Sequence, residues 1–218
     1  MTTPKTATSR YASIPFGTAA IACFACWALA LLLVHALRPD RPLATTWISG
    51  YAVGPYGWVM TTGWLVASCG CLMLALGLAR GGPQSAAARV GRLLLGILSL
   101  GFLITAIFPP GKGTVSGEIH SMFFLVNVAS FLLGSVCLSV SFRCDPSWRS
   151  FRRTAAILSS LAVVAFALLF LAAYFEVLHG LANRFFVAVI IIWLLATSIR
   201  LRAVERGSAE QPPPSAVP

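Results

Sequence analysis

The stretch TAAILSSLAVVAFALLFLAAYFE, residues 154–176, carries no charged side chain before its last residue. At about 1.5 Å per residue, a helix of this length covers roughly 35 Å, enough to cross a hydrocarbon core of about 30 Å. The stretch therefore predicts a membrane-spanning helix. Five further stretches share this length and character, so the sequence predicts six spans, at about 15–37, 57–79, 91–109, 119–142, 154–176 and 183–201.

The composition of the whole chain is that of an integral membrane protein. Of its 218 residues, 58% are hydrophobic and 10% are charged, where a soluble domain has about 25% charged residues. The formal net charge of +10 comes from basic residues that flank the apolar stretches, so nucleic acid is excluded as a partner and membrane lipids are expected around the chain. The predicted fold class is all-α, a polytopic six-transmembrane-helix bundle, whose oligomeric state the sequence leaves open.

The basic residues divide unevenly between the two sides of the membrane. Twelve of the 16 Lys and Arg residues lie in the N-terminal segment, the second and fourth loops and the C-terminal segment. The other four lie in the first, third and fifth loops: Arg38, Arg41, Lys112 and Arg184. Because cytoplasmic loops carry the excess of Lys and Arg, we expect both termini in the cytoplasm and the odd-numbered loops outside.

Three segments follow from this topology: a cytoplasmic N-terminal segment (1–14), the transmembrane domain (15–202) and a cytoplasmic tail (203–218). The tail is rich in Pro, Ser and Ala and is expected to be disordered. Within the domain, three glycines recur every seven residues along one helix face: Gly63, Gly70 and Gly77. Small residues let helix backbones approach in lipid, so this face is expected to pack closely against a neighbour.

Ionisable residues gather at the outer ends of the predicted spans. All three histidines lie there, and so do three of the six acids: His35, His120, His179, Asp40, Glu118 and Glu176. Such groups are costly near hydrocarbon unless they are paired, solvated or bound to a metal, so this layer indicates a functional site.

The stretch TVSGEIHSMFF, residues 114–124, shows how far helix capping explains this layer. Ser116 is a plausible N-cap, and Glu118 falls in the first turn, where the helix dipole stabilises a carboxylate. Neither argument explains His120, which lies one turn deeper and on the same helix face as Asn127.

Several chemistries suit the outer layer. The candidate catalytic residues are His120, Glu118, His179 and Glu176, and the last two share a helix face if the fifth span continues that far. The candidate metal ligands are His35, His120 and His179, which would suit a zinc ion that activates water to cleave a lipid ester or amide. A histidine beside a carboxylate relays protons in an alternative interpretation. In the simplest interpretation, these side chains only contact water at the membrane surface. The sequence assigns no cofactor.

The predicted function is binding or transport of a small molecule or a lipid head group in a vestibule on the outer face. The candidate ligand-binding residues are Tyr51, Tyr56, Trp58, His120, Glu176 and Arg184. Two alternatives remain open: a zinc-dependent membrane hydrolase that acts on a lipid, and a structural membrane partner without chemistry of its own. Whether the protein is an enzyme therefore stays open.

Three segments of the outer layer also carry a resemblance: ISGYAVGPYGWVM (48–60), AIFPPGKGTVSGEIH (106–120) and GLANRFF (180–186). Their order and their positions at helix ends resemble the prokaryotic six-helix membrane family catalogued as domain of unknown function 998, over roughly residues 15–202. The most specific element combines an aromatic and glycine cluster with Phe108-Pro109 and Gly117-x-x-His120; the cluster is Tyr51, Gly54, Tyr56, Gly57 and Trp58.

The resemblance implies the same fold and topology, in the inner membrane of a prokaryotic cell with both termini cytoplasmic. It implies no catalytic residue, because the family has no assigned activity. Members often carry an acid shortly after the Phe-Pro pair, where this chain has Pro110, Gly111 and Lys112. They also often carry Gln where this chain has Asn183, so the resemblance assigns that position no role.

Overall fold

The structure, a computed structural model, describes residues 15–210. Six long helices make up most of this part of the chain: α1 (Phe16–Leu37), α2 (Gly57–Gly81), α3 (Ala86–Ile107), α4 (Val115–Ser141), α5 (Arg152–Tyr174) and α6 (His179–Glu210). Three short 3-10 helices join them: η1 (Ile48–Ala52), η2 (Phe142–Cys144) and η3 (Arg149–Phe151). All six long helices are long and apolar enough to cross a membrane, which confirms the predicted fold class.

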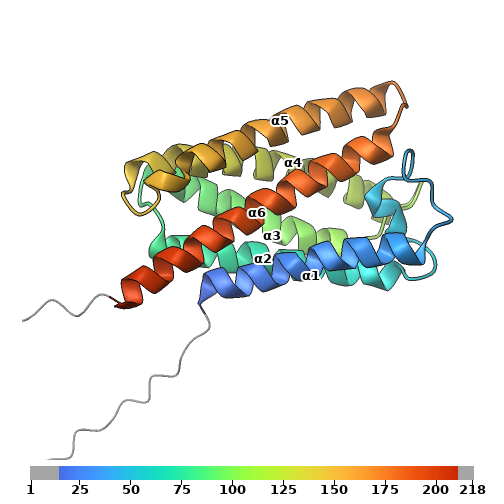
Figure 1. The fold of residues 1–218 in the computed structure, drawn as a ribbon. Coiled ribbons are helices and arrows are strands. Elements are labelled where there is room, and N and C mark those ends of the chain that lie inside the picture. The colour runs from blue at the N-terminus through green and yellow to red at the C-terminus, as the bar shows by residue number, and fades with distance from the viewer. Residues whose placement is uncertain (1–14, 211–218) are drawn as a thin grey trace, which may run out of the picture.

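The helices run side by side as a closed bundle (Figure 1). Each helix packs against the next in the chain, and α6 also packs against α1 and α2, so the last helix closes the arrangement. The first residues of α1 and the last residues of α6 lie at the same end (Figure 1). We call this end, with the α2–α3 and α4–α5 connections, the terminal end. The loop end is the opposite one, with the α1–α2, α3–α4 and α5–α6 connections.

Two of the helices that begin earlier than predicted, α3 and α4, are capped by hydroxyl side chains. The Oγ of Ser85 accepts a hydrogen bond from the backbone N–H of Ala88 at 3.2 Å, so α3 begins at Ala86 instead of near residue 91. The Oγ1 of Thr114 accepts one from the N–H of Gly117 at 3.0 Å and starts α4. The predicted N-cap Ser116 is therefore wrong: its hydroxyl donates to the carbonyl of Pro109 at 2.7 Å.

The turn between α5 and α6 also differs from the prediction. Helix α5 ends at Tyr174, and Glu176 has a left-handed φ of 56° in the turn that follows. His179 is the first residue of α6. The two side chains therefore do not share a face of α5, because the helix ends before either residue.

Helix α6 extends past its predicted end. It continues to Glu210, so residues 203–210 are helical where the composition indicates a disordered tail. The carboxylate of Glu205 accepts a hydrogen bond from the N–H of Gly17 at 3.1 Å, which ties this last part of α6 to the start of α1. The remaining parts of the predicted terminal segments, 1–14 and 211–218, lie outside the described residues.

The glycine face of α2 packs closely against its neighbours, as predicted. A Cβ atom at Gly63 would lie 3.3 Å from Trp27, and one at Gly70 would lie 2.7 Å from Phe24, both on α1. At Gly77 the neighbours are Phe16 of α1 and Leu201 of α6. Helices α1 and α2 are thus held at a distance that side chains at these positions would prevent.

Candidate functional site

The connection between α1 and α2 folds over the loop end and is held there by Arg184 of α6. The Nη1 of Arg184 donates hydrogen bonds to the carbonyls of Leu43 at 2.9 Å and Thr46 at 2.8 Å. Its Nη2 donates to the hydroxyl of Tyr51 at 3.1 Å. Because a guanidinium offers several donors in a fixed fork, one side chain fixes three points of the connection.

His35 completes this set of contacts from the end of α1. Its Nδ1 lies 2.6 Å from the carbonyl of Leu31, which only accepts hydrogen bonds, so this nitrogen carries the proton. Its Nε2 accepts a hydrogen bond from the Nε of Arg184 at 2.9 Å. Both ring nitrogens are therefore occupied and the imidazole is neutral, which leaves no lone pair for a metal ion.

Asn183 holds the same connection at a further point, the start of η1. Its Oδ1 accepts a hydrogen bond from the backbone N–H of Ile48, at the start of η1, at 3.0 Å, and the side chain is buried. We call the set of His35, Tyr51, Asn183 and Arg184 the loop latch. The sequence assigned no role to Asn183; a polar residue next to an arginine at the start of an apolar span was the available signal.

A cavity of about 470 Å³ lies beneath the latched connection. This volume falls within the range of small-molecule sites, about 300 to 1,000 Å³. Five helices and the connection line it. Its apolar wall is formed mainly by Trp27, Trp47, Ile48, Met60, Trp64, Leu98, Phe102, Phe124, Leu125, Val128, Phe186, Val187 and Ile190. The polar lining residues are Ser49, Thr105, His120, Ser121, Asn127 and Asn183, and none of the described lining residues is Asp, Glu, Lys or Arg.

His120 is presented to this cavity by α4 with one nitrogen already occupied. Its Nδ1 donates a hydrogen bond to the carbonyl of Phe108, at the end of α3, at 2.9 Å. Its ring packs against Trp64, with the ring centroids 5.5 Å apart. The ring also interacts with the backbone of Thr105, and no residue that the structure describes donates a hydrogen bond to Nε2. The neutral imidazole therefore has an acceptor available to a ligand in the cavity.

Further polar atoms belong to the same wall. The amide Nδ2 of Asn127 donates to the Oγ1 of Thr105 at 3.3 Å, and this hydroxyl donates to the carbonyl of Gly101 at 2.8 Å. The Oδ1 of Asn127 and the indole Nε1 of Trp27 are buried without a hydrogen-bond partner among residues 15–210. Sequence reasoning placed Asn127 on the His120 face but did not single out Trp27, because an aromatic residue within a span indicates only packing.

The structure divides the six predicted ligand-binding residues among different places. His120 lines the cavity, whereas Tyr51 and Arg184 belong to the loop latch. The other three neither line the cavity nor belong to the latch. Tyr56 is 46% exposed and Trp58 is 67% exposed, and Glu176 is exposed in the α5–α6 turn. A role in ligand binding stays a prediction for these residues, which do not line one vestibule.

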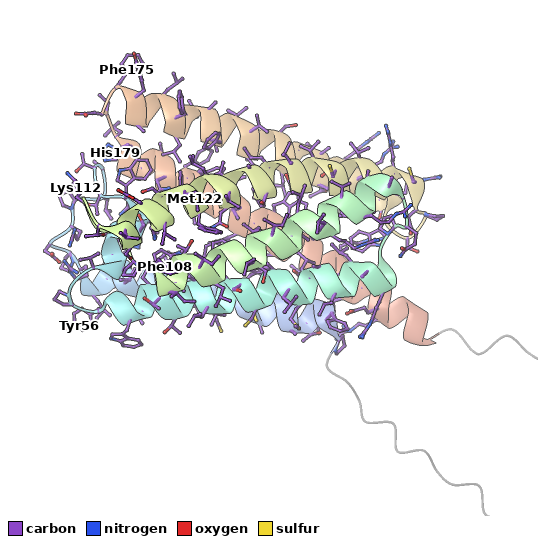
Figure 2. All side chains as sticks on the ribbon, turned by 180° about the vertical axis from the view of Figure 1, so that it is seen from behind. Tyr56, Phe108, Lys112, Met122, Phe175 and His179 are labelled. Atoms are coloured by element: carbon purple, nitrogen blue, oxygen red, sulfur yellow. The ribbon has the colours of Figure 1, made fainter. Side chains whose placement is uncertain are left out.

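The candidate catalytic and metal-binding residues are also dispersed. Glu118 is exposed on the first turn of α4, and the ring of His179 packs against Trp47, with centroids 5.3 Å apart. Figure 2 shows His179 and Tyr56 at opposite edges of the loop end. Within residues 15–210, no three His, Cys, Asp or Glu side chains come close enough to hold one metal ion. Zinc binding and lipid hydrolysis stay predictions, and the described residues contain no group of side chains that could ligate the zinc ion.

Comparisons with known proteins place the chain in a family. No curated protein and no solved structure matches it. The family model described as "Protein of unknown function (DUF998)" matches residues 11–200. The match contains all three segments that carry the resemblance and all of the cavity-lining residues. It covers most of the six-helix bundle, and the chain therefore belongs to the DUF998 family of membrane proteins of unknown function.

Proposed function

We propose that this membrane protein binds an uncharged amphiphilic small molecule, or an uncharged lipid head group, in the cavity beneath the loop latch. The observation that carries the proposal is the hydrogen bonding of His120. One nitrogen is fixed by the carbonyl of Phe108, so the other offers its lone pair in a defined direction within an apolar cavity. A hydroxyl or amide N–H of a ligand would donate to this lone pair.

The wall of the cavity supports an uncharged ligand. Burying a charge costs far more than burying a hydrogen-bonded polar group, and the described lining offers no ionised partner. Three tryptophans, Trp27, Trp47 and Trp64, and several aliphatic side chains line the cavity and favour a ligand with a largely apolar body. The ligand is therefore mostly apolar, with a small number of hydrogen-bonding groups.

The two ends of the cavity support binding in preference to transport. On α4, the lining residues Ser121 and Leu125 are exposed, Leu125 to 62%, so the cavity reaches the surface of the bundle there. At the deeper end, the rings of Phe131 and Trp193 meet edge to face with centroids 5.7 Å apart, and both are fully packed. A ligand has a route in at α4, and this aromatic pair blocks its way toward the terminal end.

We also place the loop end on the outer side of the membrane. Ten Lys and Arg residues of the described chain lie at the terminal end and four at the loop end, and the positive-inside rule assigns the richer end to the cytoplasm. Labelling with a membrane-impermeant maleimide tests this. In intact cells we expect reaction at Lys112→Cys and none at the native Cys144, which reacts only after permeabilisation. The reverse order would overturn the orientation.

Photolabelling tests the proposed ligand class. The probe is a long-chain alcohol that carries a diazirine, used beside its methyl ether. We expect competed labelling to concentrate on residues 121–128 and 187–190. The alcohol should bind about three to ten times more tightly than the ether, because only the alcohol donates a hydrogen bond to His120. His120→Phe should remove this difference while the ether still binds.

A matched pair of variants locates the binding. Ser121→Trp narrows the cavity where it meets the surface and should reduce labelling. Met122→Trp is the control, because Met122 is the next residue on α4, is 54% exposed and does not line the cavity. Labelling spread evenly over lipid-facing positions, or equal labelling of the two variants, would rule out the proposed site.

A further inference from the structure

A second groove lies at the terminal end, between α4 and α5, and has a volume of about 350 Å³. Three arginines line its mouth: Arg143, Arg152 and Arg153. Arg143 belongs to η2, directly after α4, and the other two begin α5. The groove shares no lining residue with the cavity beneath the loop latch, so it is a separate site.

These three guanidinium groups form no ion pair within the described structure. All three are exposed, and none forms a hydrogen bond or an ion pair with a residue from 15 to 210. The acid closest to Arg143 in the sequence is Asp145; its Oδ1 accepts a hydrogen bond from the backbone N–H of Ser147 at 2.8 Å, and it forms no ion pair with a described residue. Three like charges around one groove repel one another, and an anion bound among them would remove this repulsion.

Hydroxyl groups lie deeper in the same groove. The Oγ atoms of Ser139 and Ser159 are 3.0 Å apart, and the indole N–H of Trp193 donates to Ser159 at 3.0 Å, which fixes the pair. Ser160 is exposed, and its hydroxyl forms no hydrogen bond with any described residue. It follows Arg153 by seven residues, which is roughly 10 Å along α5.

The groove also has an apolar side that faces the bilayer. Val136 and Val140 of α4 line it and are 43% and 40% exposed. Both lie within a helix that is long and apolar enough to span the membrane. A soluble anion would make no contact with these side chains, whereas the acyl chain of a lipid bound in the groove would.

We propose that this groove binds an anionic phospholipid. The arginines bind the phosphate, the free hydroxyl of Ser160 donates to an ester carbonyl, and the two valines contact an acyl chain. The arginines lie at the end of the bundle, and the free hydroxyl on α5 and the two valines on α4 lie within about 10 Å of them along the helix axes, so one lipid could contact all three kinds of group. Basic pockets between spanning helices bind phospholipid head groups in this way.

Native mass spectrometry of the detergent-purified protein tests the site. The probes are phosphatidic acid, phosphatidylglycerol and, as the uncharged reference, phosphatidylcholine. We expect both anionic lipids to bind at least about ten times more tightly than phosphatidylcholine, since each charge-assisted hydrogen bond to phosphate supplies about this factor. Inorganic phosphate should compete weakly, because it lacks the acyl chains.

Two double variants separate a site from general attraction to positive charge. Arg152→Gln with Arg153→Gln should weaken phosphatidic acid binding about tenfold or more. Arg89→Gln with Arg206→Gln removes the same charge from exposed residues at the terminal end outside the groove, and should change binding by less than about twofold. Arg152→Lys with Arg153→Lys keeps the charge without the guanidinium fork and should lie between them.

Three results would overturn the proposal: equal loss in the two glutamine pairs, equal binding of phosphatidylcholine, or competition by inorganic phosphate as strong as by the lipid. Thermal unfolding of each variant shows whether it is folded. If the Arg152→Gln with Arg153→Gln variant does not fold, the lysine double variant is used in its place to measure the loss of phosphatidic acid binding. Ser121→Trp should leave phosphatidic acid binding unchanged, so failure of the cavity proposal and failure of this one are distinguishable.

Discussion

His35 and His120 both lie at the loop end, and the sequence predicts both as metal ligands. In the structure they differ in what meets the second ring nitrogen. Each donates through Nδ1 to a backbone carbonyl, but only His35 also accepts a hydrogen bond at Nε2, from Arg184, which is 149 residues away in the chain. The same side chain is therefore part of the loop latch at one position and an available acceptor at the other. The partner of the second nitrogen decides which role a histidine has.

Removing Arg184 should have the largest effect on this comparison. Arg184→Met takes away the donors to His35, Tyr51 and the carbonyls of the α1–α2 connection. Leaving several buried acceptors unpaired should destabilise the protein by about 3 kcal/mol or more. Chemical unfolding in detergent measures this, and binding to the cavity should fall as well, because the connection forms its roof.

Arg41→Met is the control for this variant. Arg41 lies on the same connection, and its Nε is 4.0 Å from a carboxylate oxygen of Asp40, a weak exposed pair. Its loss should cost less than about 0.5 kcal/mol. Equal destabilisation by the two substitutions would mean that Arg184 acts only through its charge, and the latch would be disproved.

Exchanging the two histidines for phenylalanine separates their roles directly. His35→Phe should destabilise the protein by about 2 kcal/mol, because it leaves the Nε–H of Arg184 without its acceptor. His120→Phe should cost about 1 kcal/mol but remove the preference of the cavity for the alcohol over the ether. Chemical unfolding measures the loss of stability of each variant, and photolabelling measures the preference of each variant for the alcohol over the ether. If His35→Phe alone removed the preference, the assignment of the available acceptor would be wrong.

Asn183 belongs to both regions, since it holds η1 through Ile48 and also lines the cavity. Asn183→Leu has a similar volume but leaves the buried N–H of Ile48 unpaired, at a cost of about 1 kcal/mol. Melting temperature in detergent would show this loss. Because the substitution keeps His120 intact, the alcohol should still bind more tightly than the ether, and loss of that preference would show that the two regions are coupled.

The smallest effect concerns pH. The guanidinium of Arg38 donates to Asp40 at 2.8 Å and holds the pKa of that carboxyl below its ordinary value of 3.8. A lowered folded-state pKa means that the stabilisation is present above the unfolded value and is lost as the pH falls through the folded value. Wild type should therefore be more stable than Asp40→Asn near neutral pH, and the two melting temperatures should converge below about pH 4. A constant difference would exclude this pair as the cause.

The six spans and the glycine face of α2 were predictable from the sequence, whereas the residues that line the cavity were predictable only in part. His120 and Asn127 share a helix face, and this follows from their spacing alone, so the sequence associates these two residues correctly. Glu176 and His179 were associated on the same rule, which failed because α5 ends at Tyr174 and the turn separates them. Spacing predicts neighbours only while one helix continues.

The sequence by itself determined the six spanning helices, the close packing of α2 against α1 and the concentration of histidines at one end. These properties depend on the hydropathy and size of residues a few positions apart, which the chain encodes locally. Only the tertiary structure decided that Arg184 reaches His35, that Asn183 holds η1, and that His120 is left facing a cavity. The physical reason is that a hydrogen-bond partner is set by the position of distant segments in space, and no local pattern records which donors will reach a given acceptor.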